Sequence, residues 1–192
     1  MKLNLTPENQ PQPVKGCVLL AEPFLNDPYF KRTVILLCEH NDEGTFGFVL
    51  NNYIDVELDQ VMDDMPTLNT RVSIGGPVKN SNLYYLHTLG THLEDSVEVI
   101  EGVYLGGDFD ALKHKITKGE VQANQVRFFV GYAGWSPNQL DAEIRKKSWY
   151  ITNITADTLM DTHHEDLWKT VMEQQGPSGS LIANLPEDPS LN

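Results

Sequence analysis

The stretch GYAGWSPNQLDAEI, residues 131–144, has the residue types of a ligand site. Gly131 and Gly134 would let a backbone approach a ligand closely, and a helix starting near Ser136 would offer free N–H groups to an anion. The spacing differs, however, from the dinucleotide-binding pattern G-x-G-x-x-G, and no phosphate-binding lysine follows. Ser136 also lies outside a G-x-S-x-G nucleophile motif. The stretch therefore predicts no catalytic residue and no cofactor-binding residue.

The same stretch has a structural interpretation, in which a strand leads directly into a helix. Ser136 would be the N-cap, Pro137 the first helical residue and Gln139 the third, which gives the S-x-x-Q form of a capping box. Trp135 and Leu140 would pack together as a hydrophobic staple. We favour this structural junction and keep a ligand or partner surface as the alternative.

Histidine, acidic and cysteine side chains could support metal or nucleophilic chemistry. The densest cluster is HHED at 163–166. Neighbouring side chains on a helix point about 100° apart, so these histidines could not readily share one ion, and the H-E-x-x-H zinc motif is missing. Cys17 and Cys38 lie in apolar runs and are expected to be buried, reduced thiols. We therefore expect no metal and no cofactor.

Polar residues at the ends of predicted strands carry a rival hypothesis, an enzyme acting on a small polar substrate. Arg32, His40 and Asn51 would then line one deep pocket, and at least one of their pKa values would be perturbed. A serine-histidine-acid triad cannot be assigned, because its members lie far apart in a chain.

The net charge limits the class of partner. The chain has 14 Lys plus Arg and 27 Asp plus Glu, a formal charge of −13. Such a surface repels nucleic acid unless a strong basic patch is set aside, and the short basic segments at 113–118 and 145–147 fit helix faces and helix ends better. We expect no direct nucleic-acid binding. We also expect no membrane association, because the longest apolar runs fall far short of the ~20 residues that cross a bilayer.

These side chains must be positioned by a mixture of strands and helices. A β-hairpin is predicted over 33–52, and the tail from Gln175 is expected to be loop. Strands are predicted at 16–21, 33–40, 45–52, 71–78, 82–88, 96–107, 125–135 and 148–155, and helices at 58–65, 108–118 with Asp108 as N-cap, 136–146 and within 156–174. Strands and helices do not alternate strictly. We therefore predict an α+β fold, a single compact domain with a curved mixed β-sheet that could be barrel-like, and flanking helices.

The 192 residues fit one domain. Residues 1–15 are rich in proline and amides and predict a flexible N-terminal arm, residues 16–185 form the domain, and residues 186–192 form a C-terminal tail. Residues 1–15 contain no apolar segment of the kind found in secretory signals, so we predict a cytoplasmic protein.

Four motifs resemble the YqgE/AlgH family of bacterial proteins. They are GCVLLAEPFLNDPYFKRTVILLCEHN from residue 16, GTFGFVLN from 44, IGGPV from 74 and FFVGYAGWSPNQLDAEI from 128, with Trp149 after them. The resemblance covers roughly residues 16–190 and implies a compact cytoplasmic α+β domain with a curved mixed sheet, without agreed catalytic residues. The family commonly has Asn-Arg-Pro where this chain has Asn51-Asn52-Tyr53, and the missing cation argues against an anion-binding role for that loop.

The leading hypothesis is a non-enzymatic binding or regulatory protein of the YqgE/AlgH type, whose partner is an unidentified protein or small molecule. The label of transcriptional regulator, carried by some family members, transfers poorly, because the chain has no helix-turn-helix pattern, zinc-finger spacing or basic face. Small residues beside aromatic ones make a close docking site. The candidate contact surface is therefore Gly131, Tyr132, Gly134, Trp135 and Ser136, with the turn Gly75-Gly76-Pro77 as a second candidate.

Overall fold

The structure is a computed structural model that describes residues 10–164 and 166–187, apart from the side chains of residues 80 and 81. The predicted arm includes residues 1–9 and the predicted tail includes residues 188–192, which lie outside the described residues. The flexible arm and the tail therefore stay predictions.

Strands make up most of the regular structure. They are β1 (Val18–Ala21), β2 (Val34–Asn41), β3 (Gly44–Val49), β4 (Tyr53–Ile54), β5 (Val72–Ile74), β6 (Val78–His87), β7 (Val97–Ile100), β8 (Val103–Leu105), β9 (Val126–Trp135) and β10 (Trp149–Thr152). The helices are α1 (Leu58–Val61), α2 (Phe109–Thr117), α3 (Gln139–Arg145), α4 (Ala156–Met160), α5 (Leu167–Glu173) and α6 (Pro177–Ala183), with single 3₁₀ turns at Gly90–His92 and Ala123–Gln125.

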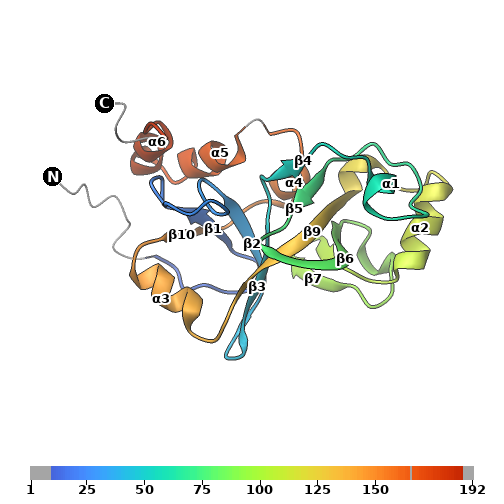
Figure 1. The fold of residues 1–192 in the computed structure, drawn as a ribbon, viewed down its shortest axis with the longest axis horizontal. Coiled ribbons are helices and arrows are strands. Elements are labelled where there is room, and N and C mark those ends of the chain that lie inside the picture. The colour runs from blue at the N-terminus through green and yellow to red at the C-terminus, as the bar shows by residue number, and fades with distance from the viewer. Residues whose placement is uncertain (1–9, 165, 188–192) are drawn as a thin grey trace.

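The ten described strands form one mixed sheet in the order β10-β1-β2-β3-β9-β6-β8-β7, with β5 beside β9 and β4 beside β5. β5 runs parallel to β9, and the other pairs are antiparallel. Figure 1 shows β9 passing from the half that carries α1 and α2 to the half that carries α3. This arrangement confirms the predicted α+β fold, and the sheet is open rather than closed into a barrel.

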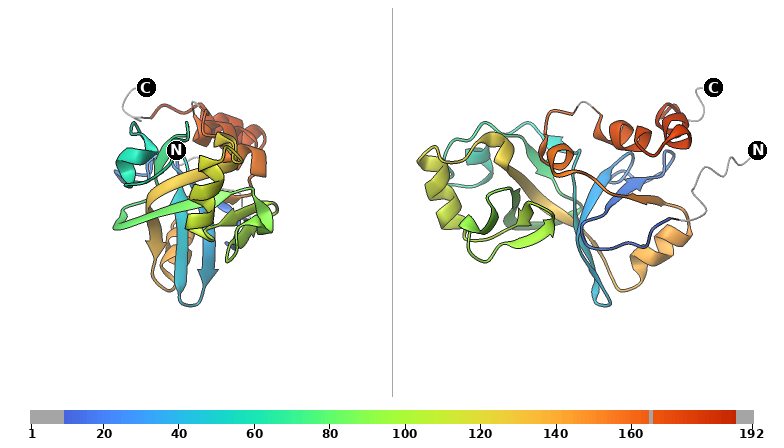
Figure 2. Two further views of the ribbon diagram at one scale, coloured as in Figure 1. Left: turned by 90° about the vertical axis from the view of Figure 1, so that its right-hand side faces the viewer. Right: turned by 180° about the vertical axis from the view of Figure 1, so that it is seen from behind.

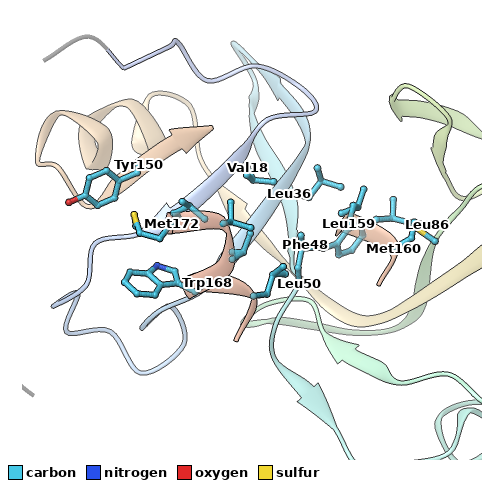
Figure 3. Packing of buried hydrophobic residues seen from close by; sticks show 14 of the residues in the cluster. Val18, Leu36, Phe48, Leu50, Leu86, Tyr150, Leu159, Met160, Trp168 and Met172 are labelled. Carbon is cyan, nitrogen blue, oxygen red and sulfur yellow. The ribbon is translucent and has the colours of Figure 1, made fainter. Parts of the chain in front are cut away.

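In the half with β1 and β2, helices cover both faces of the sheet (Figures 1 and 2). In the half with β1 and β2, Leu36, Phe48 and Trp168 belong to the cluster formed with α4, α5 and α6, shown in Figure 3. On the other face, Ile35 and Leu140 belong to the cluster formed with α3. A third cluster packs α1 and α2 against β6 and β9. The continuous apolar run in β2 is therefore explained, since neighbouring residues point into different cores.

Helices α1 and α6 differ from the prediction. α1 stops at Val61, four residues before the expected end. The tail from Gln175 was expected to be loop, yet α6 occupies Pro177–Ala183, with Pro177 in the first turn after Gly176. Proline suits the first turn because a backbone N–H there would have no acceptor within the helix, so no hydrogen bond is lost. Burial of Ile182 stabilises the helix.

β10 is an edge strand of the sheet, and the side chain of Gln10 covers part of that edge. The Gln10 amide donates to the carbonyl oxygen of Trp149 at 3.3 Å and accepts from the backbone N–H of Ile151 at 2.8 Å. Within the described part of the chain, each helix is too short or too polar to cross a bilayer.

Candidate functional site

A tight turn at residues 136–139 connects β9 to α3. The backbone N–H of Gln139 donates to the carbonyl of Ser136 at 3.0 Å, and Asn138 adopts the left-handed conformation with φ 63°. The prediction of Ser136 as N-cap is therefore wrong: Asn138 occupies that position, without a side-chain capping bond, and α3 begins at Gln139. Asparagine tolerates the left-handed region better than most residues, which lets the chain turn once before it coils.

The predicted Ser-Gln pairing survives within this turn. The side-chain oxygen of Gln139 accepts from the backbone N–H of Ser136 at 3.1 Å and from its hydroxyl at 3.0 Å. The Ser136 hydroxyl is thus held by an amide rather than by an imidazole base. Ser136 positions the turn, in agreement with the structural interpretation of the stretch.

Trp135 is a core residue. Its side chain is 5% exposed, and its indole N–H donates to Oε2 of Glu143 at 2.9 Å. The ring stacks on Phe30 and lies in one cluster with Leu140, as the hydrophobic staple predicts. Trp135 therefore packs in the core, and its place in the contact surface stays a prediction.

The two predicted glycine segments meet at one place. A Cβ added to Gly75 would lie 2.3 Å from the carbonyl oxygen of Gly131, and one added to Gly76 would lie 2.2 Å from the carbonyl carbon of Tyr132. Both contacts are shorter than a real Cβ tolerates, so the glycines allow two backbones to cross closely. Gly75, Gly76 and Gly131 are buried, whereas Pro77 and Tyr132 are half-buried.

Two members of the predicted surface, Gly134 and Ser136, are exposed. They lie beside the tip of the β2–β3 hairpin, because Thr45 pairs with Trp135 and Phe46 with Gly134 in the sheet. The ladder fixes the hairpin tip against the corner that starts α3. The surface left open there is the candidate functional site.

A hollow lies between the hairpin tip and the start of α3. Its volume is about 460 Å³, and it is lined by His40, Asn41, Asp42, Thr45, Asn138, Leu140 and Asp141. A second, smaller hollow of about 230 Å³ shares Asn41 and Thr45 with it and is also lined by Glu39, Glu43, Gly44, Phe46 and Trp135. The turn NDEG at 41–44 was interpreted only as a hairpin turn. Its acids became site residues because β9, far along the chain, brings α3 to the same place.

The hollow is acidic. Asp42 and Asp141 line it, Glu39 and Glu43 line the smaller hollow beside it, and neither Lys nor Arg occurs among the described residues of either wall. Carboxylates from two elements create a negative potential in a concave surface, which favours cationic groups and disfavours phosphates. The arrangement can therefore bind an ammonium or guanidinium group.

The hollow also contains one pair of groups with catalytic geometry. Nδ1 of His40 lies 2.7 Å from Oγ1 of Thr45, a hydroxyl beside a base. The other two residues of the enzyme hypothesis lie at the opposite end of β2, where the Asn51 amide donates to the carbonyl of Arg32 at 2.8 Å. The eight residues of β2 span roughly 25 Å. The structure therefore does not bring Arg32, His40 and Asn51 into one pocket.

The two cysteines are buried thiols, as the sequence predicts. Cys17 and Cys38 are free and buried, and burial raises the pKa of each thiol, so both are held in the unreactive protonated form. Among the described residues, no group of three His, Cys, Asp or Glu side chains could hold a metal ion.

Comparison with known proteins decides the family. The AlgH-like family model matches residues 18–180. The chain belongs to the AlgH-like family. The AlgH-like region contains both hollows, from Glu39 to Asp141, together with both glycine segments.

AlgH-like relatives match this chain over nearly its whole length. A UPF0301 protein of Cytophaga hutchinsonii is 38% identical over 179 residues, 93% of this chain and 98% of that protein. A UPF0301 protein of Chlorobaculum tepidum is 39% identical over 177 residues, 92% of this chain and 95% of that protein.

Solved structures share the AlgH-like fold. The solution structure of AlgH from Pseudomonas aeruginosa has a TM-score of 0.72 at 26% identity, covering 94% of this chain and 98% of that one. A crystal structure of a Corynebacterium diphtheriae protein has a TM-score of 0.78 at 24% identity, covering 92% and 95% of the two chains, and shows the fold alone.

Proposed function

We propose that this AlgH-like protein is a non-enzymatic binding protein with a regulatory role, and that its acidic hollow receives a basic segment of a partner protein. The observation that carries the proposal is the hollow of about 460 Å³ between the β2–β3 hairpin and α3, with carboxylates contributed by both elements. A lysine or arginine side chain entering between Asp42 and Asp141 would make charge-assisted hydrogen bonds to both.

The rigidity of the surrounding backbone supports this proposal. The pairing of Thr45 with Trp135 holds the hairpin tip, and Trp135 is anchored in the core through Glu143. A site that is already formed loses less conformational entropy when a ligand binds. The exposed Gly134, a member of the predicted contact surface, pairs with Phe46 of the hairpin and extends the open surface there.

A peptide-binding assay tests the proposal. The probe is a fluorescent arginine-rich peptide, and fluorescence anisotropy measures its affinity for the whole protein. We expect the double variant Asp42→Asn, Asp141→Asn to weaken binding about tenfold or more, because each charge-assisted hydrogen bond contributes on the order of 1.5–3 kcal/mol.

The matched control is the double variant Asp63→Asn, Asp64→Asn, which removes two exposed acids near α1 and so makes the same change in net charge. Equal weakening by both double variants would mean that the peptide senses only the overall charge, and the proposed site would be refuted. If only the Asp42/Asp141 variant weakens binding, the natural partner is the protein that the wild type captures from the native cell and that this variant does not capture.

A second candidate function, an enzyme acting on a small polar substrate, is favoured by the contact between His40 and Thr45. On an ester, the imidazole would take the proton of the Thr45 hydroxyl as its oxygen attacks the carbonyl carbon, and would give that proton to the departing alcohol as the ester C–O bond breaks; water would then hydrolyse the acyl-threonine. The test is a screen of activated esters with wild type and Thr45→Val. Turnover that disappears in Thr45→Val would support an enzyme, and equal rates for both proteins would count against it.

We also propose a cytoplasmic location. Two cysteines that are free and buried are typical of a compartment that keeps thiols reduced. Expression of a fluorescent fusion in the native host, followed by fractionation, tests this directly.

A further inference from the structure

A second cavity lies on the side of the molecule opposite the hairpin tip, near β4 and α4 in Figure 1. Its volume is about 330 Å³, within the range of small-molecule sites. Its wall includes Tyr53 and Asp55 from the chain around β4, Glu57 at the start of α1, Arg71 before β5, and His163 after α4. A neighbouring cavity of about 300 Å³ shares Asn69, Thr70 and His163 with it.

The ring of Tyr53 lies near two guanidinium groups. Cζ of Arg71 is 3.8 Å from the ring centroid and Cζ of Arg127 is 5.6 Å from it. Arg127 also donates to the Tyr53 hydroxyl at 3.1 Å. The aromatic ring thus holds Arg71 at the cavity wall, and a hydrogen bond from Arg71 to the carbonyl of Thr162 at 3.0 Å fixes its orientation.

Neither guanidinium has an acidic partner in the part of the chain that the structure describes, where no carboxylate oxygen lies within 4.0 Å of Arg71 or Arg127. Arg71 is exposed and uses one of its five donors on Thr162, so the others are available to a ligand.

Arg127 adds a positive field beneath the cavity. It is fully buried, its Nη atoms donate to Leu50, Leu159 and Tyr53, and its Nε has no acceptor. Burial of the guanidinium lowers the pKa of Arg127. Asp161 opposes this lowering and Arg71 adds to it. Burial of a charge is costly even with an acid nearby, and an anionic group bound beside Arg71 would offset part of that cost.

The wall of the cavity also carries negative charge. Asp55 and Glu57 line the same cavity and are exposed, without an ion pair to another described residue. They would repel a phosphate or another multiply charged anion, whereas they would attract an ammonium group. A cavity lined by both a guanidinium and carboxylates therefore matches a ligand that carries both charges.

We propose that the cavity beside Tyr53 binds a zwitterion of the α-amino-acid type, with its carboxylate on Arg71 and its ammonium group near Asp55 and Glu57. The site is separate from the acidic hollow and does not depend on the function proposed for it. The loop Asn51-Asn52-Tyr53 itself carries no cation, as the sequence indicated, and the cation comes from the chain segment before β5 instead.

The experiment is an NMR titration of the whole protein with L-leucine and L-phenylalanine. The carboxamide of each amino acid lacks the carboxylate, and the N-acetyl derivative lacks the ammonium group. We expect the free amino acids to shift the amide resonances of residues 69–71 and 163, and both derivatives to bind about tenfold or more weakly, since each removes a charge-assisted contact. Arg71→Gln and Asp55→Asn should weaken binding of the free amino acid to a similar degree.

The controls are Lys118→Gln and Asp63→Asn, which change an exposed cation and an exposed acid elsewhere. Circular dichroism establishes that each variant is folded, and Asp55→Asn keeps the test valid should Arg71→Gln unfold. The absence of shifts at these residues up to millimolar amino acid would overturn the proposal. Equal binding of the N-acetyl derivatives, or competition by inorganic phosphate, would overturn it too, because either result describes a simple anion site.

Discussion

The indole rings of Trp135 and Trp149 meet edge-on, with centroids 6.2 Å apart, and both donate their N–H groups to the same oxygen of Glu143, at 2.9 and 2.8 Å. Glu143 lies on α3, Trp135 ends β9 and Trp149 begins β10. One carboxylate thus ties the helix to two strands at the base of the acidic hollow.

Replacing Glu143 by alanine leaves both buried indole N–H groups without an acceptor. We expect the free energy of unfolding to fall by about 2–4 kcal/mol, since each unsatisfied donor costs on the order of 1–3 kcal/mol. Urea denaturation measures it. Glu143→Gln retains an acceptor oxygen and should lose less; a loss below about 1 kcal/mol in Glu143→Ala would contradict the shared role of this carboxylate.

Trp135→Ala separates a core role from a surface role. Because the side chain is 5% exposed, we expect a loss of about 3–5 kcal/mol in the free energy of unfolding. Ser136→Ala, at the exposed neighbouring position, should lose less than about 1 kcal/mol. A Trp135→Ala protein of normal stability would contradict the core role of this side chain and favour the surface role.

Gly76→Ala tests the close crossing of two backbones. The added methyl group would lie 2.2 Å from the carbonyl carbon of Tyr132, so the strands would have to separate. We expect the variant to unfold or to lose more than about 4 kcal/mol. Gly119→Ala is the matched control: Gly119 has φ +70° but nothing within 4 Å of its added Cβ, and should lose only about 1 kcal/mol. Similar losses in both variants would show that backbone strain, not the crossing, decides the effect.

His87 should make stability depend on pH. Its side chain is fully buried, Nε2 donates to the carbonyl of Gly106 at 2.9 Å, and Nδ1 accepts from the N–H of Leu89 at 3.2 Å, so the ring is neutral. Burial lowers the pKa of His87 below its ordinary value of 6.5. Above about pH 6.5 both states are neutral and the contribution is fully present. Below about pH 6.5 the unfolded chain takes up a proton that the folded protein does not, so the free energy of unfolding decreases as the pH is lowered.

The measurement is the urea midpoint between about pH 5 and pH 7.5. We expect the midpoint of the wild type to fall more steeply towards low pH than that of His87→Gln. His92→Gln, at an exposed histidine, should keep the slope of the wild type. Parallel curves for wild type and His87→Gln would mean that His87 does not titrate differently in the two states.

The strands could be predicted from the sequence because burial leaves a direct mark on residue type. The run VILLC in β2 and the turn NDEG after it predicted the hairpin correctly. The N-cap of α2 was also correct, since Asp108 accepts from the N–H of Ala111 at 3.0 Å. The N-cap of α3 was wrong because S-P-N-Q satisfies its hydrogen bonds in a turn before the helix starts.

The site residues were harder to predict, because the ladder between Thr45 and Trp135 joins segments 90 positions apart in the chain. Nothing local in NDEG indicates that α3 lies beside it. The buried Arg127 had a signal that was not used: it is the single charge within the apolar run VRFFV. A cation in a fully buried strand indicates internal hydrogen bonds and, in this protein, leads to the Tyr53 cavity.

The Gln10 amide has a consequence for the protein in solution. An edge strand with unpaired N–H and C=O groups can pair with a strand of a second molecule. The primary amide of Gln10 makes the hydrogen bonds that one peptide unit of such a strand would make. A version of the chain that starts after this glutamine would leave β10 uncapped, and would self-associate and precipitate more readily than the parent at equal concentration.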